Sequence, residues 1–345
     1  MDLLDNLDAV RSLDPEGALD IAGDSASQLR WEPVIEQADD GDFRPSRIVL
    51  AGMGGSGLAA RAIKNWLQLQ CPLEVVNDYV LPKWVNEETL AILISVSGNT
   101  EETISSFEDA QNKGARIVVM ATGGKLIDLA KERGVPYVEL LKVPQPRYGS
   151  IIQIKAISKI LEYYDVAEGL LEQIKILDES VSSMIGQIKP EVPTTDNFAK
   201  QLALKCVGKT PIIYSSTLFS PVAYKWKISF NENAKNTAWW NELPEFSHNE
   251  FIGWSSHPIE KPFVVIDLRS NFDRPRISER FELTDRLLSG KRPSAHEIRL
   301  HGESVICQMI CGFIMADYVS IYLALLNGVD PTPVELVERL KRELS

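Results

Sequence analysis

Residues 47–60 read Arg-Ile-Val-Leu-Ala-Gly-Met-Gly-Gly-Ser-Gly-Leu-Ala-Ala, and this stretch decides the expected fold. Its first part, Ile48 to Ala51, is a short apolar run typical of a buried strand. Four glycines follow, and apolar residues then recur at helical spacing from Leu58 to Leu67. A strand, a glycine loop and a helix start form an anion site, because free N–H groups and the positive helix end point to one place. A tight turn without a ligand is the alternative for this stretch taken alone.

A second stretch has the same order of elements. Leu90 to Ile94 is apolar, residues 95–100 read Ser-Val-Ser-Gly-Asn-Thr, and a helix is expected next, with Thr100 or Asn99 as its cap. Three hydroxyl side chains lie within these six residues, those of Ser95, Ser97 and Thr100. They suit the acceptor oxygens of a phosphate monoester. Because neither loop has the lysine or the following acidic residue of a nucleotide site, the pair predicts a site for one compact phosphate.

The pattern around these loops predicts an α/β fold of two doubly wound domains, each a mainly parallel sheet flanked by helices. The first domain is expected at 46–145, with strands at 47–51, 73–77, 90–95, 116–121 and 136–140 and helices at 57–68, 100–113 and 124–133. The second is expected at 193–345, with strands at 211–215, 226–230, 262–267 and 296–300 and a long helix at 304–326. Residues 1–45 are expected to form a helical segment packed on the first domain, and residues 146–192 a linker with helices.

The composition restricts the partners and the compartment. A formal charge of −12 excludes nucleic acid and anionic membranes as expected partners, and no uninterrupted apolar run reaches membrane-spanning length. Four scattered cysteines predict no disulfide framework, and the histidines and cysteines show no metal-ligand spacing. The acidic N-terminus differs from a signal peptide, so the expected location is cytoplasmic.

Four charged residues in the second part of the chain are candidates for chemistry. Glu232, in Asn-Glu-Asn-Ala-Lys, follows the expected strand 226–230 and would start a helix at the mouth of a sheet; the alternative is an ordinary first-turn glutamate. His248 lies in a polar loop, and histidine is a common proton-transfer side chain, although most loop histidines are simply at the surface. Arg147 follows a proline-bounded break, and Lys341 ends a segment of alternating charge, so both are ordinarily solvated.

The motif pair Gly-Met-Gly-Gly-Ser-Gly and Ser-Val-Ser-Gly-Asn-Thr-Glu-Glu-Thr closely resembles the sugar isomerase (SIS) domain. The resemblance implies that a sugar phosphate is held by the two loops, through Gly55, Ser56, Ser95, Ser97 and Thr100.

Two further segments, Asn231 to Lys235 and Ala238 to Glu250, resemble a metal-independent branch of this superfamily, the bifunctional phosphoglucose/phosphomannose isomerases. The resemblance covers nearly the whole chain and implies interconversion of glucose 6-phosphate and mannose 6-phosphate with fructose 6-phosphate through a cis-enediol. It implies Glu232 as the proton-transfer base, His248 in ring opening, Arg147 beside the enediolate and Lys341 at the phosphate or the ring oxygen. It also implies no cofactor and a homodimer in which His248 acts across the interface.

Two alternatives remain open from the sequence. The first alternative is an SIS isomerase for another sugar phosphate. The second is a non-catalytic sugar-phosphate-binding regulator, although regulators usually carry a basic DNA-binding module, which the sequence does not indicate. The family expects a threonine shortly before the lysine, and Thr332 and Val334 both lie near that position. The resemblance implies that use of mannose 6-phosphate depends on the residue at this position.

Overall fold

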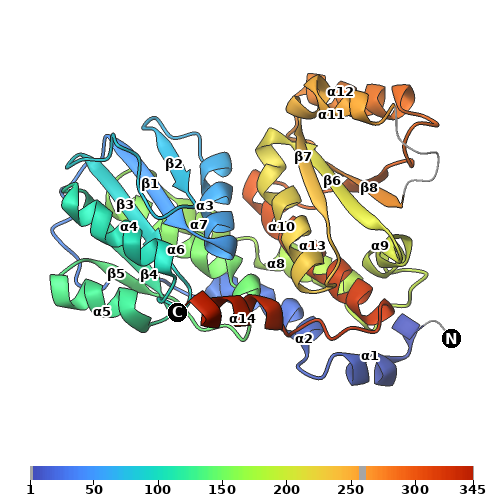
Figure 1. Cartoon of the computed structure of the whole chain (residues 1–345), viewed down its shortest axis with the longest axis horizontal. Helices are drawn as coiled ribbons and strands as arrows, with labels where there is room; N and C mark the ends of the chain where they lie inside the picture. The colour runs from blue at the N-terminus through green and yellow to red at the C-terminus, as the bar shows by residue number, and fades with distance from the viewer. Residues whose placement is uncertain (1–2, 256–261, 345) are drawn as a thin grey trace. The chain divides into compact units, whose positions relative to one another are not determined.

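The computed structural model describes residues 3–255 and 262–344, and the side chains of Lys341 and Leu344 lie outside the described part. The chain divides into two compact units. One unit contains residues 25–179, and the other contains residues 1–24 together with residues 180–345. Each unit is built on one parallel sheet, and we call them the five-stranded unit and the four-stranded unit (Figure 1).

The five-stranded unit has the strand order β2-β1-β3-β4-β5, with every neighbouring pair parallel. Its strands are β1 (Arg47–Gly52), β2 (Leu73–Val76), β3 (Thr89–Ile94), β4 (Arg116–Ala121) and β5 (Tyr137–Glu139). Its helices are α3 (Gly54–Trp66), α4 (Glu101–Asn112), α5 (Gly124–Arg133), α6 (Ser150–Tyr163) and α7 (Leu170–Lys175), with two 3-10 helices at η2 (Asp24–Arg30) and η3 (Pro146–Tyr148). The expected strands and helices of this region are confirmed to within a few residues.

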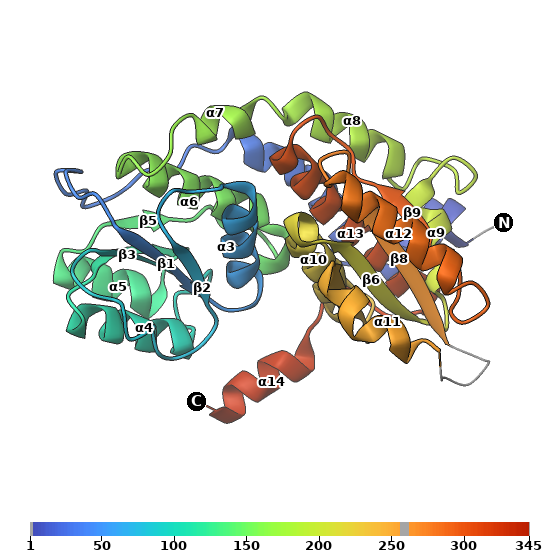
Figure 2. The ribbon, with the colours of Figure 1, turned by 90° about the horizontal axis from the view of Figure 1, so that it is seen from above.

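Burial on both faces explains why these strands are almost entirely apolar. Every residue of β3 is buried, and in β1 and β4 only the first residue is partly exposed. Alternate residues such as Val49 and Val119 join Phe107 of α4 and Leu126 of α5 in one core cluster. Helices α3 and α6 cover the opposite face of the sheet (Figure 2). A parallel sheet covered by helices on both faces requires such continuous apolar runs.

This strand order predicts the position of a ligand site. The chain passes from β1 to β2 on one side and then crosses back to β3 on the other, so the order reverses between β1 and β3. In open α/β sheets the loops at the carboxyl ends of two such strands diverge and leave a crevice. The glycine loop follows β1 and the serine loop follows β3. The topology therefore brings the two predicted phosphate loops to the same edge of the sheet.

The four-stranded unit repeats this topology. Its strands are β6 (Thr210–Ser216), β7 (Trp239–Leu243), β8 (Phe263–Arg269) and β9 (His296–Arg299). They are all parallel in the order β7-β6-β8-β9, which is the order of the first four strands of the other sheet. The prediction of two α/β domains of one architecture is confirmed.

The four-stranded unit also contains helices and short 3-10 helices. The helices are α1 (Leu7–Leu13), α2 (Ala18–Gly23), α8 (Asp178–Ile188), α9 (Phe198–Cys206), α10 (Ser220–Glu232), α11 (Glu250–Gly253), α12 (Pro275–Leu287), α13 (Val305–Leu326) and α14 (Glu335–Leu344). The 3-10 helices are η1 (Leu3–Asp5), η4 (Thr217–Phe219) and η5 (Glu245–His248). Helix α13 is long and apolar enough to cross a membrane, but 89% of its apolar window is buried inside the structure, as in the core helix of a domain.

One predicted strand is wrong, and one strand was missed. Residues 226–230 lie within α10, and the edge strand next to β6 is β7. The run from Trp226 to Phe230 alternates apolar and polar residues, but Val222, Trp226 and Phe230 also recur every four residues and are all buried. The helical period extends over the longer segment and Pro221 favours a helix start, so the helix forms. The β7 sequence Trp-Trp-Asn-Glu-Leu is too polar to be recognised as a strand.

The expected domain boundaries also differ from the two units. Residues 1–45 do not form one segment on the first domain, because residues 1–24 belong to the four-stranded unit. There Lys200 Nζ donates to the carbonyl oxygen of Leu4 at 2.7 Å, and Thr194 N donates to Asp5 Oδ1 at 2.8 Å. Residues 146–179 are part of the five-stranded unit rather than a linker. Helix α6 is buried on nearly all sides against this unit, and so it could not serve as a linker.

Candidate active site

The glycine loop has the geometry that the sequence predicts. Helix α3 begins at Gly54, directly after β1, and Met53 at its N-cap provides no side-chain hydrogen bond. The N–H groups of Ser56 and Gly57 donate to the carbonyl oxygen of Met53 at 2.9 Å and 3.3 Å, so at this helix start the N–H groups of Gly54 and Gly55 are the ones left for a ligand or water. Ser56 lies in the first turn and is buried, and Gly55 lies beside it. The loop therefore combines free donors with the positive end of a helix of three turns.

The serine loop is held together by its own hydroxyl groups. Ser95 is buried, and its Oγ lies 2.8 Å from Thr100 Oγ1 and accepts from the N–H groups of Gly98 at 3.1 Å and Thr100 at 3.4 Å. Thr100 occupies the N-cap position of α4, but its side chain does not cap the helix, contrary to expectation, because it pairs with Ser95. Ser97 is exposed, and its Oγ accepts from Asn99 N at 3.2 Å. Ser97 is thus the hydroxyl most open to a ligand.

Arg147 lies next to the glycine loop and is not solvated. It belongs to η3, is buried, and its guanidinium lies 5.4 Å from the ring centre of Tyr148. A Cβ placed on Gly55 would come within 4.0 Å of the carbonyl oxygen of Pro146, so η3 packs close to the first turn of α3. Gln28 Nε2 also donates to the carbonyl oxygen of Tyr148 at 2.8 Å. The structure therefore places the backbone of η3, which carries the buried Arg147, beside the predicted phosphate loop.

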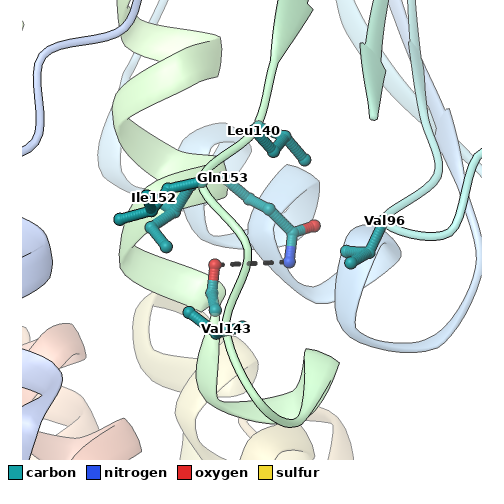
Figure 3. Close-up of a pocket in the computed structure, with 7 residues that line it drawn as sticks. Val96, Leu140, Val143, Ile152 and Gln153 are labelled. Carbon is teal, nitrogen blue, oxygen red and sulfur yellow. Dashed lines mark hydrogen bonds between the residues drawn. The ribbon is translucent and has the colours of Figure 1, made fainter. Parts of the chain in front are cut away.

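A small cavity lies behind the serine loop (Figure 3). Its volume is about 10 Å³, and its lining is formed by Val96, Leu140, Leu141, Val143, Gly149, Ile152 and Gln153. Gln153 Nε2 donates to the carbonyl oxygen of Gly149 at 3.4 Å. Such a volume holds about one water molecule, so the cavity is too small for a sugar.

Glu232 occupies a different position from the predicted one. It is the last residue of α10 and not the first residue of a helix. At this end the helix dipole places partial negative charge near the carboxylate, so the stabilisation expected from a helix start does not exist. The loop after it contacts the end of the sheet where strands begin, because Asn236 Nδ2 donates at 2.9 Å to the carbonyl oxygen of Lys209, the residue before β6. Glu232 therefore lies at the amino edge of the four-stranded sheet.

His248 lies at the other edge of the same sheet. It ends η5, which follows β7, and its side chain is exposed. The segment is tied to the carboxyl edge, since Thr217 Oγ1, directly after β6, donates to the carbonyl oxygen of Leu243 at 3.1 Å. Glu250 closes the segment by accepting from Asn241 Nδ2 at 2.7 Å and from the hydroxyl of Tyr214.

Glu232 and His248 of one chain are therefore separated by the length of the sheet. Strand β7 has five residues between the two edges. At about 3.3 Å per residue, the edges are roughly 16 Å apart. The backbones of Glu232 and His248 thus lie at opposite ends of the strands in one four-stranded unit.

The remaining candidates lie at the C-terminus. Lys341 belongs to α14, but its side chain is outside the described residues. Thr332 is buried and its N–H donates to Asp330 Oδ1 at 2.9 Å, whereas Val334 is partly exposed at the start of the α14 segment. Within residues 3–255 and 262–344, no group of three His, Cys, Asp or Glu side chains is placed to hold a metal ion.

The sequence analysis missed Asn77 as a residue of the glycine loop. Asn77 follows β2, its Nδ2 donates to the carbonyl oxygen of Gly52, and its Oδ1 accepts from Arg61 Nη2 at 2.8 Å. A Cβ on Gly57 would overlap Asn77 Nδ2, so this amide also requires a glycine there. A polar residue at the end of a strand that neighbours β1 is the signal that could have revealed it.

Comparison with known proteins agrees with this geometry. Residues 43–136 match the model of the SIS domain, and residues 195–344 match that of the bacterial phospho-glucose isomerase C-terminal SIS domain. The bifunctional phosphoglucose/phosphomannose isomerase of Aquifex aeolicus is 34% identical over 322 residues, covering 92% of this chain and 95% of that protein. The protein of the same name from Caldicellulosiruptor bescii is 36% identical over 307 residues, covering 87% and 89%. The chain belongs to the bifunctional phosphoglucose/phosphomannose isomerase family.

The chain is also similar to one epimerase and to one solved structure. A D-glucosamine-6-phosphate 4-epimerase of Sulfolobus acidocaldarius is 32% identical over 249 residues, covering 69% of this chain and 77% of that protein. The crystal structure of a glucose-6-phosphate isomerase like protein from Thermus thermophilus has the same fold, with a TM-score of 0.68, 22% identity and full coverage of both chains.

Proposed function

We propose that this chain is an aldose–ketose isomerase that converts glucose 6-phosphate and mannose 6-phosphate to fructose 6-phosphate and back. The observation that carries the proposal is the edge of the five-stranded sheet. There an uncapped helix start and the hydroxyls of Ser95, Ser97 and Thr100 follow the two strands at which the order reverses. This arrangement suits a single phosphate group, and membership of the family specifies a hexose phosphate as its carrier.

The reaction moves one proton between adjacent carbons, and four side chains have proposed roles. Glu232 takes the proton from C2 and returns it to C1 through a cis-enediol, which needs a base but no redox group. Arg147 is fixed beside the glycine loop and supplies positive charge for the enediolate. We assign ring opening to His248 and contact with the phosphate or the ring oxygen to Lys341.

We further propose that the active form is a homodimer in which His248 acts in the partner's site. The positions of Glu232 and His248 at opposite ends of one sheet support this assignment, because about the length of β7 separates their backbones in the same unit. Strand β7 is an edge strand, and Trp239 on it and Ile252 near His248 expose large apolar surfaces. A second copy of the chain would bury these surfaces and deliver the imidazole.

The test is turnover with each substrate. The purified chain is assayed with glucose 6-phosphate, mannose 6-phosphate and, as the competing possibility, glucosamine 6-phosphate, all in the presence of a chelator. We expect fructose 6-phosphate from the first two and no dependence on metal. The variant Glu232→Gln keeps shape but loses basicity, so kcat should fall by roughly 10²–10⁴ for both substrates, with exchange of the C2 hydrogen into solvent lost as well.

Three outcomes would contradict the proposal. Binding of fructose 6-phosphate without conversion would indicate a regulator. Conversion of glucosamine 6-phosphate alone would indicate a different sugar phosphate. A Glu232→Gln variant that keeps C2 exchange, or loses only one of the two activities, would assign the base to another residue.

A further inference from the structure

The end of α10 that carries Glu232 is attached to α13 by a buried polar contact. Asn233 follows Glu232 directly, occupies the C-cap position of α10 and is fully buried. Its Nδ2 donates to Ser320 Oγ on α13 at 2.9 Å. Ser320 is also fully buried, and its hydroxyl lies 2.7 Å from the carbonyl oxygen of Ala316, to which it donates. A buried amide donor and the hydroxyl that accepts from it hold two helices in one relative position, because separating them removes this acceptor from the buried Nδ2.

This contact is the last of a polar stripe along α10. Residues 225, 229 and 233 lie four apart and share one face of the helix. Lys225 Nζ and Ser229 Oγ both contact Asp317 Oδ1, at 2.7 Å and 2.8 Å. Polar contacts of this kind fix the register of two packed helices more narrowly than apolar side chains do. The stripe therefore sets how far α10 extends toward the amino edge of the sheet.

The residue on the other side of Glu232 is held as well. Asn231 Oδ1 accepts from Ala238 N at 3.1 Å, which closes the loop between α10 and β7. The backbone of Glu232 thus lies between two asparagines whose amide groups are both engaged. Neither contact involves the carboxylate itself.

We propose that Asn233 and Ser320 are positioning residues that hold the backbone of Glu232 in place for proton transfer. The inference rests on the proposed function of Glu232 as the base. A base must lie within hydrogen-bond reach of the proton it removes, and a displacement of about 1 Å can lower the rate by roughly 10²-fold. Loss of the Asn233–Ser320 bond should then reduce the rate of proton transfer with little change in substrate binding.

The experiment compares Asn233→Ala, Ser320→Ala and the double variant with a matched control, Tyr322→Phe. Tyr322 is on the same helix and equally buried, and its hydroxyl donates to the carbonyl oxygen of Ile188 at 2.7 Å, away from α10. Its loss removes one buried hydrogen bond without touching α10. Melting temperature, kcat, KM and C2 hydrogen exchange are measured for all variants and for Glu232→Gln.

We expect all single variants to lose similar stability, but only the Asn233 and Ser320 variants to lose kcat and C2 exchange. The decrease should be roughly 10- to 100-fold with KM within about twofold, and the double variant should lose no more than the worse single variant. If Ser320→Ala and Tyr322→Phe have equal kcat while Glu232→Gln is inactive, this inference is wrong and the proposed function stands. A chain without turnover, or one that works without Glu232, would overturn the proposed function and this inference with it.

Discussion

Gly98 in the serine loop has a φ of +69°, and its Cα lies against the backbone at Gly123 and Gly124, so no side chain fits there. A Cβ at this position would overlap the carbonyl oxygen of Gly123. Gly114 has nearly the same φ, +71°, but a Cβ there would meet nothing within 4 Å. The two glycines therefore share the conformational requirement and differ only in the close approach of the backbone.

We predict different consequences for Gly98→Ala and Gly114→Ala. Each alanine takes a left-handed conformation, which costs about 1–2 kcal/mol of unfolding free energy. Gly98→Ala must also displace the loop that holds Ser97, so its stability should fall further and its KM for hexose phosphate should rise. Chemical denaturation and steady-state kinetics measure both effects. Identical stability and kinetics of the two variants would show that the close approach at Gly98 has no consequence.

Asp267 is a carboxylate in the interior of the four-stranded unit. It lies in β8, is 1% exposed, and neither of its oxygens accepts a hydrogen bond from the described residues. Arg292 Nη2 is 3.9 Å from Asp267 Oδ2 but only 2.7 Å from Asp285 Oδ1. Because burial outweighs the attraction of Arg292, the pKa of Asp267 is raised to about 7.

This raised pKa predicts a pH-dependent stability. The folded carboxyl keeps its proton to a higher pH than the unfolded one, so unfolding releases a proton between about pH 4 and pH 7. The contribution of Asp267 to the unfolding free energy therefore falls as the pH rises through this window. Asp267→Asn should remove that slope. Compared with the wild type, the variant should therefore gain more unfolding free energy at pH 8 than at pH 5. Asp8→Asn, at a side chain that is 98% exposed, is the control and should keep it.

Denaturation midpoints between pH 4.5 and pH 8 measure the difference between the two variants. If Asp267→Asn keeps the pH slope of the wild type, burial does not raise the pKa of Asp267 and the prediction is wrong.

At the scale of elements, the hydroxyl groups of the serine loop, to which we assign phosphate binding, are not equivalent. Ser95 is buried and accepts two backbone hydrogen bonds in addition to its contact with Thr100. Ser97 is exposed and accepts one. Both belong to the turn between β3 and α4, so one short loop contains a structural hydroxyl and an open one.

We predict that Ser95→Ala and Ser97→Ala separate these two roles. Ser97→Ala should raise KM by roughly tenfold to hundredfold, since it removes one donor to the phosphate worth about 1–3 kcal/mol, and should leave the melting temperature unchanged. Ser95→Ala should raise KM and also lower the unfolding free energy by about 1–3 kcal/mol, because two N–H groups lose their acceptor. A loss of stability in Ser97→Ala as large as in Ser95→Ala would refute the distinction.

At the scale of the whole molecule, the sheet of the four-stranded unit separates two residues that the proposed reaction needs together. Glu232 lies where the strands begin and His248 lies where they end. The proposed dimer resolves this separation by pairing residues of different chains. It also accounts for the exposure of His248 in the isolated chain.

We predict that inactive Glu232→Gln and inactive His248→Ala proteins regain activity when their subunits are mixed. A mixed dimer contains one site of two with both residues intact. Random exchange at equal amounts makes half of the dimers mixed, so activity should approach about a quarter of that of the same amount of wild-type protein. Native mass spectrometry confirms the exchange, and mixing Glu232→Gln with a Glu232→Gln, His248→Ala double variant is the control that should stay inactive. No recovery in verified mixed dimers would place the two residues in the same site or exclude one from catalysis.

Much of the five-stranded unit was determined by the sequence alone. Apolar strand runs, glycines at the end of β1 and hydroxyls at the end of β3 are local signals, and their physical causes act within a few residues of the chain. The parallel sheet and the placement of Ser56, Ser95, Ser97 and Thr100 at its carboxyl edge follow from these signals.

Other features were decided only by tertiary structure. The segment from Trp226 to Phe230 satisfies two periods; the longer helical period and Pro221 favour the helix, and its packing on α13 buries the apolar face, which moves Glu232 from a helix start to a helix end. The assignment of residues 1–24 to the four-stranded unit depends on buried contacts such as Lys200 with Leu4, almost two hundred residues apart. The roles of Asn77 and Asp267 come from the strands beside them, and the only sequence signal for Asn77 is a polar residue at the end of a strand. A short sequence window carries the propensity of a segment, whereas its partners are set by long-range burial.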